Sequence, residues 1–415
     1  MTGGPSPARP PGFGAALRIR EFRALWAVDA VSMAGDQFAR VALSVLVYRQ
    51  TQSAFATGGV YALTFVPTFV GGVLLSGSAD RRSRKQVMVV TDLLRAGLLA
   101  TMAVPGIQLW GLCALLVVAV LLGAPFRAAQ SALVADVLTS EPLYAAGAAL
   151  RSSTLQIGQL VGYGVGGLTV ALVDPHVGLL IDAATFALSA VVIAVEVRPR
   201  PAAAPVAPGT RWWADLRGGV AVLAGHPHLR IALGLTMLAG FYVAAEGLAA
   251  PYAGAYGGGA TATGLLLAAD PAGAALGAWL FVRWVPERSR DRLMGWLAVA
   301  AGLALAACAL EPPLIGSWLL WSLSGACAAY FVQTSVVLVR HIPPGRRGQV
   351  MGLVSAGVLT CQGLGVLTAG ALAEAIGVVA AVSASGAVGA LVATVLVWRW
   401  SVTAAPARAG QAVRT

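Results

Sequence analysis

The stretch Ser76-Gly77-Ser78-Ala79-Asp80-Arg81-Arg82-Ser83-Arg84-Lys85 lies between two long apolar segments of the chain. Thr91-Asp92-Leu93-Leu94-Arg95 follows within the second of these segments. A tight cluster of one acid and four bases between membrane-length apolar segments is typical of a short cytoplasmic loop joining two transmembrane helices. The stretch therefore predicts an all-helical membrane protein.

The composition of the whole chain agrees with a membrane protein. Of the 415 residues, 58% are hydrophobic and 11% are charged, with a mean hydropathy of +0.79, whereas soluble domains are about 25% charged. A transmembrane helix needs about 20 mostly apolar residues. We expect twelve such helices, at roughly 24–47, 55–77, 87–105, 109–131, 148–172, 177–196, 230–252, 262–284, 293–311, 314–338, 350–373 and 377–399.

The basic residues are distributed unevenly between the two sides. They cluster before the first predicted span, after the second, in the central loop, after the eighth and tenth spans, and at the carboxyl terminus. Of the loops that alternate with these, the first alone carries a base, Arg49. Because basic loops stay in the cytoplasm, both termini and the central loop are assigned to that side. This pattern accounts for the net charge of +11 without a nucleic-acid partner.

The two ends of the chain are expected to be cytoplasmic tails, at 1–23 and 400–415. The first of these is rich in Gly and Pro and lacks the apolar core of a signal peptide, so we expect no cleaved leader. The 28 basic residues include a single lysine, and Ala and Gly are abundant, as GC-rich bacterial codons produce. We therefore expect a multi-pass protein of a bacterial cytoplasmic membrane.

The sequence offers no pattern for catalysis or for holding a metal or cofactor. The cysteines lie singly within predicted helices, and the histidines lie in loops or at helix ends: Cys113, Cys308, Cys327, Cys361, His176, His226, His228 and His341. Such spacing matches neither a disulfide framework nor a metal site. The run 162–167 fits a dinucleotide-binding fingerprint as text, but it lies inside an apolar helix. We expect no enzyme, no cofactor and no metal.

A central segment divides the chain into two halves. Residues 197–229 begin with four prolines and continue into an amphipathic stretch, which predicts a cytoplasmic linker with an interfacial helix. We therefore expect two six-helix halves, at 24–196 and 230–399. Two such halves enclose a cavity near the middle of the membrane, which a solute can reach from either side as the halves rock.

An internal repeat supports this division. When the first half is shifted by 206 residues, ten of 33 positions over 56–88 are identical to the second half, where roughly three are expected by chance. Arg82-Ser83-Arg84 then meets Arg288-Ser289-Arg290, and Arg40 meets Glu246. The repeat indicates duplication of a six-helix unit.

The basic stretch resembles the cytoplasmic signature of the major facilitator superfamily, which recurs between the second and third helices of its members. The pairs Asp80-Arg81 and Arg84-Lys85 match the signature, whereas Ser76 and Ser83 stand where glycines are usual. The resemblance extends over all twelve predicted spans. It implies a transporter that works by alternating access.

Two further stretches resemble one branch of that superfamily, the macrolide-efflux and enterobactin-exporter branch of the drug:proton antiporters. One is the downstream run 91–95, and the other extends from Phe22-Arg23 through Gly35-Asp36 to Thr51-Gln52-Ser53-Ala54. The resemblance implies that the basic hairpin is a gating latch whose contacts form in one orientation of the cavity and break in the other. Its residues are Asp80, Arg81, Arg84, Lys85, Asp92 and Arg95. The alternative is that the bases only fix the topology, although topology needs no Asp80.

Glycines in the fifth predicted span resemble the antiporter signature of the same family. Gly158, Gly162 and Gly166 fall four residues apart on one helix face, with Gly167 beside them, so another helix can approach closely. Tyr163 stands where that signature usually has proline. Ordinary tight packing explains the glycines equally well.

Ionisable residues inside the predicted spans are the site candidates, because such groups are costly in a membrane and usually functional. In the first span Asp36 and Arg40 are four residues apart and can pair, and Asp29 lies on the same face as Asp36. Glu246 and Asp270 lie in the seventh and eighth spans. The repeat aligns Arg40 with Glu246, so facing helices of the two halves are expected to present opposite charges to one cavity.

We expect Asp36 and Glu246 to carry a proton, with Arg40 modulating Asp36 and with Phe241, Tyr242 and Tyr252 along the substrate path. The alternatives are a structural Asp36–Arg40 pair and a structural Asp92–Arg95 pair. Asp29 and Asp270 rank lower, because a position near a helix end is an equal alternative for each.

The function expected from these features is proton-driven export of amphipathic small molecules. The expected partners are a small-molecule substrate, protons and membrane lipids, with no nucleic acid and a monomeric protein. Import of a metabolite on the same fold is the main alternative, and a lipid-handling or non-transporting membrane protein is a third. The apolar and aromatic positions that would select a substrate are scattered, so the sequence names no cargo.

Overall fold

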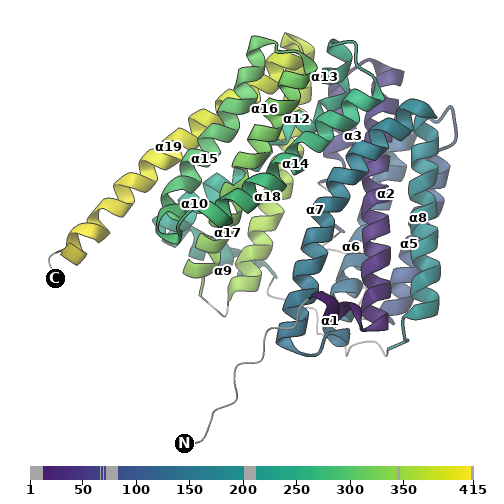
Figure 1. The fold of residues 1–415 in the computed structure, drawn as a ribbon, viewed down its shortest axis with the longest axis horizontal. Helices are drawn as coiled ribbons and strands as arrows, with labels where there is room; N and C mark the ends of the chain where they lie inside the picture. The colour runs from purple at the N-terminus through teal and green to yellow at the C-terminus, as the bar shows by residue number, and fades with distance from the viewer. Residues whose placement is uncertain are drawn as a thin grey trace, which may run out of the picture. The chain divides into compact units, whose positions relative to one another are not determined.

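The structure is a computed structural model, which describes residues 13–65, 67–68, 70–71, 83–200, 212–343 and 346–412. Every secondary-structure element within these ranges is helical (Figure 1). The helices before the central segment are α1 (Phe13–Leu17), α2 (Arg20–Thr51), α3 (Ala54–Ala62), α5 (Arg84–Met102), α6 (Leu109–Val137), α7 (Glu141–Leu172) and α8 (Pro175–Glu196). The all-helical prediction is thus confirmed.

The remaining helices follow from residue 212 onward. They are α9 (Trp212–Gly225), α10 (Pro227–Met237), α11 (Ala239–Tyr242), α12 (Ala244–Gly247), α13 (Ala249–Ala255), α14 (Ala260–Trp284), α15 (Glu287–Ala306), the short 3-10 helix η2 (Ala307–Leu310), α16 (Leu314–Cys327), α17 (Ala329–His341), α18 (Arg347–Ile376) and α19 (Val378–Ala412). Helix α9 occupies the stretch where an interfacial helix was expected. Its placement at a membrane surface stays a prediction.

Ten helical segments of the described residues are long and apolar enough to cross a membrane, against twelve predicted. The predicted second span is described as a helix from Ala54 to Ala62, and part of its remainder lies outside the described residues. The predicted third span is present as α5, whose four charged residues set it apart from the apolar ten. The second span is therefore missing from the ten because only part of it is described, and the third because it carries too many charged residues.

The predicted span 230–252 differs most from the expectation of one continuous helix. It is broken into α10, α11, α12 and α13, with bends at Leu238, Val243 and Leu248. Close packing on α18 accompanies the bends. A Cβ atom at Gly240 would lie 2.5 Å from the carbonyl oxygen of Cys361, and one at Gly247 would meet the Val366 side chain. Glycine at these two positions therefore lets α18 approach the broken span closely.

The chain folds as two compact units, each assembled from several stretches of sequence. Unit 1 comprises Met1–Ala39, Val70–Gly162 and His176–Val206, and unit 2 comprises Arg40–Phe69, Tyr163–Pro175 and Ala207–Thr415. Helices α2 and α7 contribute residues to both units. The division into six-helix halves stays a prediction.

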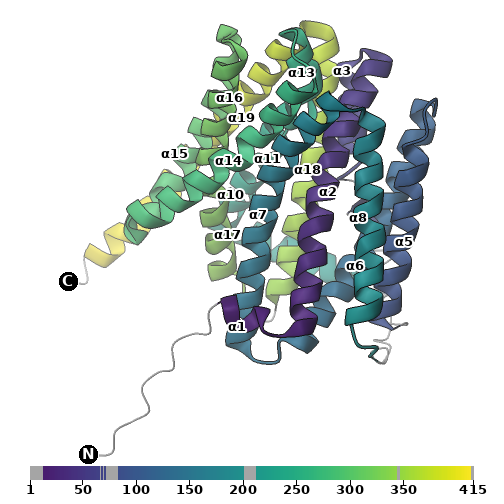
Figure 2. The same ribbon diagram turned by 45° about the vertical axis from the view of Figure 1, so that its right-hand side comes forward.

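Helices α5, α6 and α8 run alongside one another in unit 1 (Figure 1, Figure 2). Near one end of these helices an apolar core buries Phe22 and Leu25 of α2 with Met88 of α5, Leu133 of α6 and Ile193 of α8. This core holds the helix ends that carry the basic residues of the predicted latch.

In unit 2 the repeat positions Gly58 and Gly264 each allow a close helix contact. A Cβ atom at Gly58 would lie 3.3 Å from the Val366 carbonyl oxygen of α18. One at Gly264 would lie 2.6 Å from the Tyr163 carbonyl oxygen of α7, beside Gly167. Two glycines matched by the 206-residue shift therefore make corresponding contacts, of α3 with α18 and of α14 with α7.

Candidate functional site

The carboxylate of Glu246 lies on α12, within the broken span of unit 2. The Tyr61 hydroxyl of α3 donates a 2.6 Å hydrogen bond to its Oε2 atom. Tyr61 itself is buried, at 3% exposure. A hydrogen bond to a charged group is stronger than one between neutral groups, so this contact ties α3 to α12.

Two more residues complete what we term the Glu246 cluster, defined as Arg40, Tyr61, Tyr163 and Glu246. The Arg40 guanidinium of α2 lies 5.8 Å from the centre of the Tyr61 ring and interacts electrostatically with Glu246. Tyr163 of α7 is buried and interacts with both Arg40 and Glu246. The repeat predicts that Arg40 and Glu246 present opposite charges to one cavity. The two side chains interact electrostatically, and the shared cavity stays a prediction. The tyrosines were not anticipated.

Asp270 interacts electrostatically with Glu246 of the Glu246 cluster and with Tyr330. Gly325 of α16 packs directly on the Asp270 backbone, and Pro271 follows within α14. The position is therefore part of a tight helix contact.

A second group of charges lies in unit 1, where Arg95 of α5 is the ion-pair partner of Asp36. Their Nη2 and Oδ1 atoms are 3.3 Å apart. The Arg95 guanidinium also lies 3.8 Å from the ring centre of Phe186. Arg40 belongs to the Glu246 cluster, and its expected influence on Asp36 stays a prediction. A neighbouring helix, which no helix-spacing rule can anticipate, supplies the observed partner.

Asp92 and Asp182 add two buried carboxylates to what we term the Asp36 cluster, defined as Asp36, Asp92, Arg95 and Asp182. Ser189 of α8 donates a 2.5 Å hydrogen bond to Asp92. Asp92 and Arg95 attract each other electrostatically, while Asp92 hydrogen-bonds to Ser189 and Arg95 to Asp36. Asp182, at 1% exposure, interacts with both Asp36 and Arg95.

Asp182 was not predicted from the sequence, although a signal for it was present. It is an acid inside the predicted span 177–196, and the rule that selected Asp29 and Asp36 applies to it equally. Arg127 of α6 also interacts with Arg95 and Asp36. It therefore belongs with this group of charges.

Asp29 is part of a third polar group that links α2, α6 and α7. Arg151 Nε and Gln130 Nε2 donate to the Asp29 carboxylate at 3.0 and 3.1 Å. Arg151 Nη2 closes the triangle by donating to Gln130 Oε1 at 2.8 Å. Each member is satisfied by the other two, which is the arrangement expected of a structural network.

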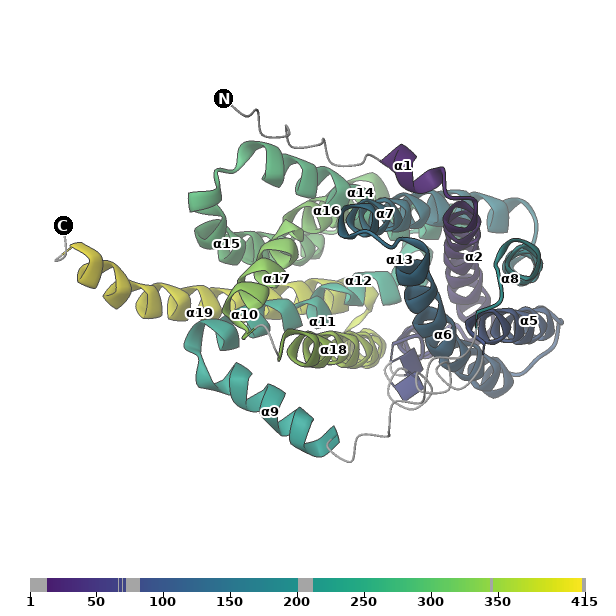
Figure 3. The same cartoon turned by 90° about the horizontal axis from the view of Figure 1, so that it is seen from below.

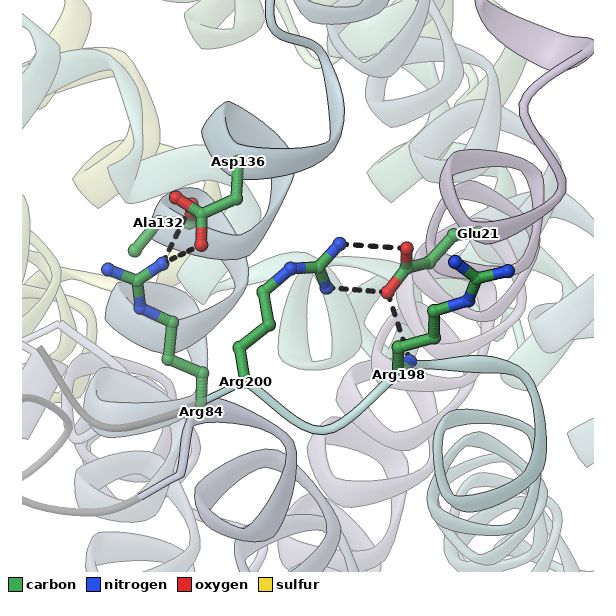
Figure 4. A network of polar contacts seen from close by, with 6 residues as sticks. All are labelled: Glu21, Arg84, Ala132, Asp136, Arg198 and Arg200. Carbon is green, nitrogen blue, oxygen red and sulfur yellow. Dashed lines mark hydrogen bonds and ion pairs between the residues drawn. The ribbon is translucent and has the colours of Figure 1, made fainter.

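Four residues of the predicted latch are described: Asp92 and Arg95 belong to the Asp36 cluster, and Arg84 and Lys85 lie at the start of α5. Arg84 pairs with Asp136 and donates to the Ala132 carbonyl oxygen of α6 (Figure 4). Lys85 donates a 2.6 Å bond to the Ala194 carbonyl oxygen near the end of α8. A cation at a helix carboxyl terminus is favourable. Asp80 and Arg81 lie outside the described residues.

Glu21 forms a second ion pair beside the latch (Figure 4). Both carboxylate oxygens accept from Arg200, at 2.6 and 2.9 Å, and the Arg198 backbone N–H donates to one of them at 3.0 Å. The hydrogen bond from Arg200 to Glu21 raises the pKa of that guanidinium above its ordinary value. The start of α2 is thereby fastened to the chain that follows α8.

The glycines of α7 contact two different neighbours. A Cβ atom at Gly162 would lie 2.7 Å from the Gln37 side chain of α2, whereas Gly167 packs on Gly264 of α14. The contact at Gly158 is looser, since a Cβ atom there would lie 3.8 Å from the Met33 side chain. Gly166 is buried. Close helix packing is thus observed at two of the four positions, and an antiport role stays a prediction.

Two of the three aromatic residues expected along a substrate path make internal hydrogen bonds in unit 2. Tyr252 is fully buried, packs edge-on against Trp321, and its hydroxyl bonds to Ser317 at 2.9 Å. The Tyr242 hydroxyl donates to the Ala298 carbonyl oxygen at 2.7 Å. These contacts are those of packing residues.

Comparison with known families identifies the architecture. A sequence profile described as the Major Facilitator Superfamily matches residues 25–321. The chain belongs to the major facilitator superfamily. It is therefore a transporter and not an enzyme, as the sequence led us to expect.

A relative of known description points to the same superfamily. The chain is 28% identical over 360 residues to the "Multidrug efflux pump Tap" of Mycolicibacterium fortuitum, and the match covers 83% of this chain and 87% of that protein. This level of identity establishes distant homology. It does not carry over the substrates of that pump.

Solved structures share the fold at low sequence identity. A POT family transporter in complex with a thioalcohol-conjugated peptide has a TM-score of 0.72 at 13% identity, covering 91% of this chain and 95% of that one. The nucleoside transporter NupG has a TM-score of 0.69 at 15% identity, with 92% and 99% covered. A bacterial homologue of the lysosomal transporter Spinster, in an inward-facing and occupied conformation, scores 0.70 at 14%, with 92% and 96% covered.

Proposed function

We propose that this member of the superfamily exports amphipathic small molecules in exchange for protons. The observation that carries the proposal is the 2.6 Å hydrogen bond between Tyr61 and Glu246. It joins a helix from the amino-terminal part of the chain to the broken span that precedes α14. Discontinuous spans are where transporters of several folds bind substrates and coupling ions.

Glu246 is the group best suited to hold the transported proton. In its ionised form it attracts the Arg40 guanidinium and accepts the Tyr61 hydrogen bond. Protonation removes the charge on which both contacts depend. The protonation state of Glu246 is thereby linked to whether α3 stays against α12.

Exchange follows if proton and substrate compete for the same carboxylate. A cationic substrate arriving from the cytoplasm displaces Arg40 and Tyr61 from Glu246, which releases α3 and lets the opposite side open. A proton from outside then neutralises the carboxylate and frees the substrate. The protein then opens to the cytoplasm again. There the positive charge of Arg40 favours release of the proton from Glu246, and the contact between the ionised carboxylate and Arg40 forms again.

Asp36 is the second candidate for a proton site, since 40% of its side chain is exposed. We assign it a smaller part than Glu246, because its charge is already paired with Arg95. The Arg84–Asp136 pair supports the proposal that the basic hairpin is a latch.

The topology inferred from the charge pattern completes the proposal. We propose a monomeric protein of a bacterial cytoplasmic membrane, with both termini inside and lipids around it. The distant homology to a multidrug efflux pump and the resemblance to the macrolide-efflux and enterobactin-exporter branch favour export over metabolite uptake.

Everted membrane vesicles test direction and coupling together. With an interior acidified by respiration and ethidium as the amphipathic probe, export predicts ethidium accumulation in the vesicles and a partial loss of the pH gradient. Accumulation that survives a protonophore would contradict proton coupling. Accumulation only in right-side-out vesicles would establish the import alternative.

A further inference from the structure

A pocket of about 250 Å³ lies between the start of α10 and the end of the membrane span of α19, both in unit 2. The two helices lie side by side (Figure 3). The pocket is lined by two arginines, Arg230 and Arg399, and by apolar side chains that include Ile231, Trp398 and Val402. It is distinct from the Glu246 and Asp36 clusters, because it shares no residue with them.

Contacts on either side of the pocket hold the two helices together. A Cβ atom at Gly234 of α10 would lie 3.1 Å from the Leu396 side chain of α19. His228 packs edge-on against Trp400, with ring centres 5.0 Å apart. The arginines are therefore presented from a fixed helix pair.

The position of the pocket along the membrane follows from the same residues. Arg230 lies in the first turn of its span, and Arg399 lies near the end of the span Val378–Val402. Trp398 and Val402 are 66% and 56% exposed. Exposed tryptophan beside arginine at a span end is typical of the boundary between headgroups and acyl chains.

The cationic and apolar lining of the pocket complements an anionic phospholipid. Two guanidinium groups can share the oxygens of one phosphodiester headgroup, since each presents a fork of N–H donors. The apolar side chains below them can take the start of an acyl chain. We propose that this pocket binds an anionic phospholipid of the leaflet that faces the central segment of the chain, which the charge pattern assigns to the cytoplasm.

Lipid retention by the purified full-length protein tests the proposal. The protein is equilibrated with equal amounts of phosphatidylglycerol and phosphatidylcholine, and bound lipid is counted by native mass spectrometry. We expect phosphatidylglycerol to be retained preferentially. Each arginine near a membrane surface is worth roughly fivefold in affinity, so Arg230→Gln combined with Arg399→Gln should lower that retention roughly 30-fold.

Matched variants separate the pocket from general charge. Arg292→Gln, which removes an exposed arginine outside the pocket, should leave retention unchanged. Arg230→Lys combined with Arg399→Lys keeps both charges but loses the fork of donors, so it should retain an intermediate amount of phosphatidylglycerol. Equal retention by wild type and the double glutamine variant would overturn the proposal. So would equal retention of the two lipids, or displacement of the lipid by an equal concentration of glycerol 3-phosphate, which carries the headgroup chemistry alone.

Discussion

The two charge clusters of this transporter differ in how their acids are balanced. In unit 1 Asp36, Asp92 and Asp182 share the neighbourhood of Arg95. Asp92 also accepts a hydrogen bond from Ser189, and Asp182 accepts one from Thr185. In unit 2 Glu246 is the single acid of its cluster: Tyr61 donates to it, Arg40 attracts it, and Tyr163 and Asp270 interact with it electrostatically. A single acid whose main partners lie on separate helices can gain and lose a proton as those helices move. An acid embedded in a shared network cannot do so without disturbing the network.

The largest expected effect is on the rate of proton-driven efflux, which should depend far more on Glu246 than on Asp36. Glu246→Gln should abolish proton-driven ethidium efflux, a loss of at least about 100-fold, because the amide cannot exchange a proton. Asp36→Asn should reduce efflux only about tenfold. Initial rates in everted vesicles at matched expression measure both.

Glu311→Gln is the matched control for that comparison, since Glu311 is an exposed glutamate between η2 and α16. It should transport at the wild-type rate. Equal losses for Glu246→Gln and Asp36→Asn would erase the distinction between the clusters.

The next effect concerns stability. Arg95→Gln removes the ion-pair partner of Asp36 and leaves three neighbouring carboxylates without it, so we expect a destabilisation of about 3 kcal/mol. Thermal unfolding of the purified protein in detergent measures the loss. Combining Arg95→Gln with Asp36→Asn should recover part of it, and an additive loss would argue against the pair.

A smaller effect is expected from the phenol. Tyr61→Phe removes the hydrogen bond to Glu246 but keeps the ring beside Arg40, so efflux should fall roughly tenfold without being abolished. Tyr252→Phe, which removes a hydroxyl bonded to Ser317, is the matched control and should transport normally if it folds as stably as wild type. An efflux rate equal to wild type in Tyr61→Phe would show that the Tyr61 hydroxyl has no role in transport.

The smallest effect is expected at the latch. The Arg84–Asp136 pair is partly exposed, with 18% and 38% of the two side chains accessible, so its coupling should be about 1 kcal/mol. A double-mutant cycle with Arg84→Gln and Asp136→Asn, read by transport rate, measures it. A coupling of zero would leave the hairpin with the role of fixing topology.

Much of the architecture could be read from the sequence, because apolar length and basic loops are local properties. The breaks in the span around Gly240 and Gly247 could not, since they depend on the contact with α18. Arg84 was singled out from its motif, but its partner Asp136 was not. Asp36 was likewise selected as an acid inside a predicted span, whereas its partner Arg95 lies 59 positions away and is set by helix packing. Asp182 could have been selected by the same rule, because it is also an acid inside a predicted span.

The central claim is that Glu246 carries the exchanged proton, and proteoliposomes test it most directly. Purified wild type and Glu246→Gln are each reconstituted, and ethidium movement is followed under an imposed pH gradient and, separately, as exchange at equal pH. We predict that Glu246→Gln shows no response to the gradient. Its ethidium exchange at equal pH should be weakened but measurable, because ethidium loses the carboxylate that it shares with the proton. A gradient response in Glu246→Gln equal to that of wild type would contradict the account.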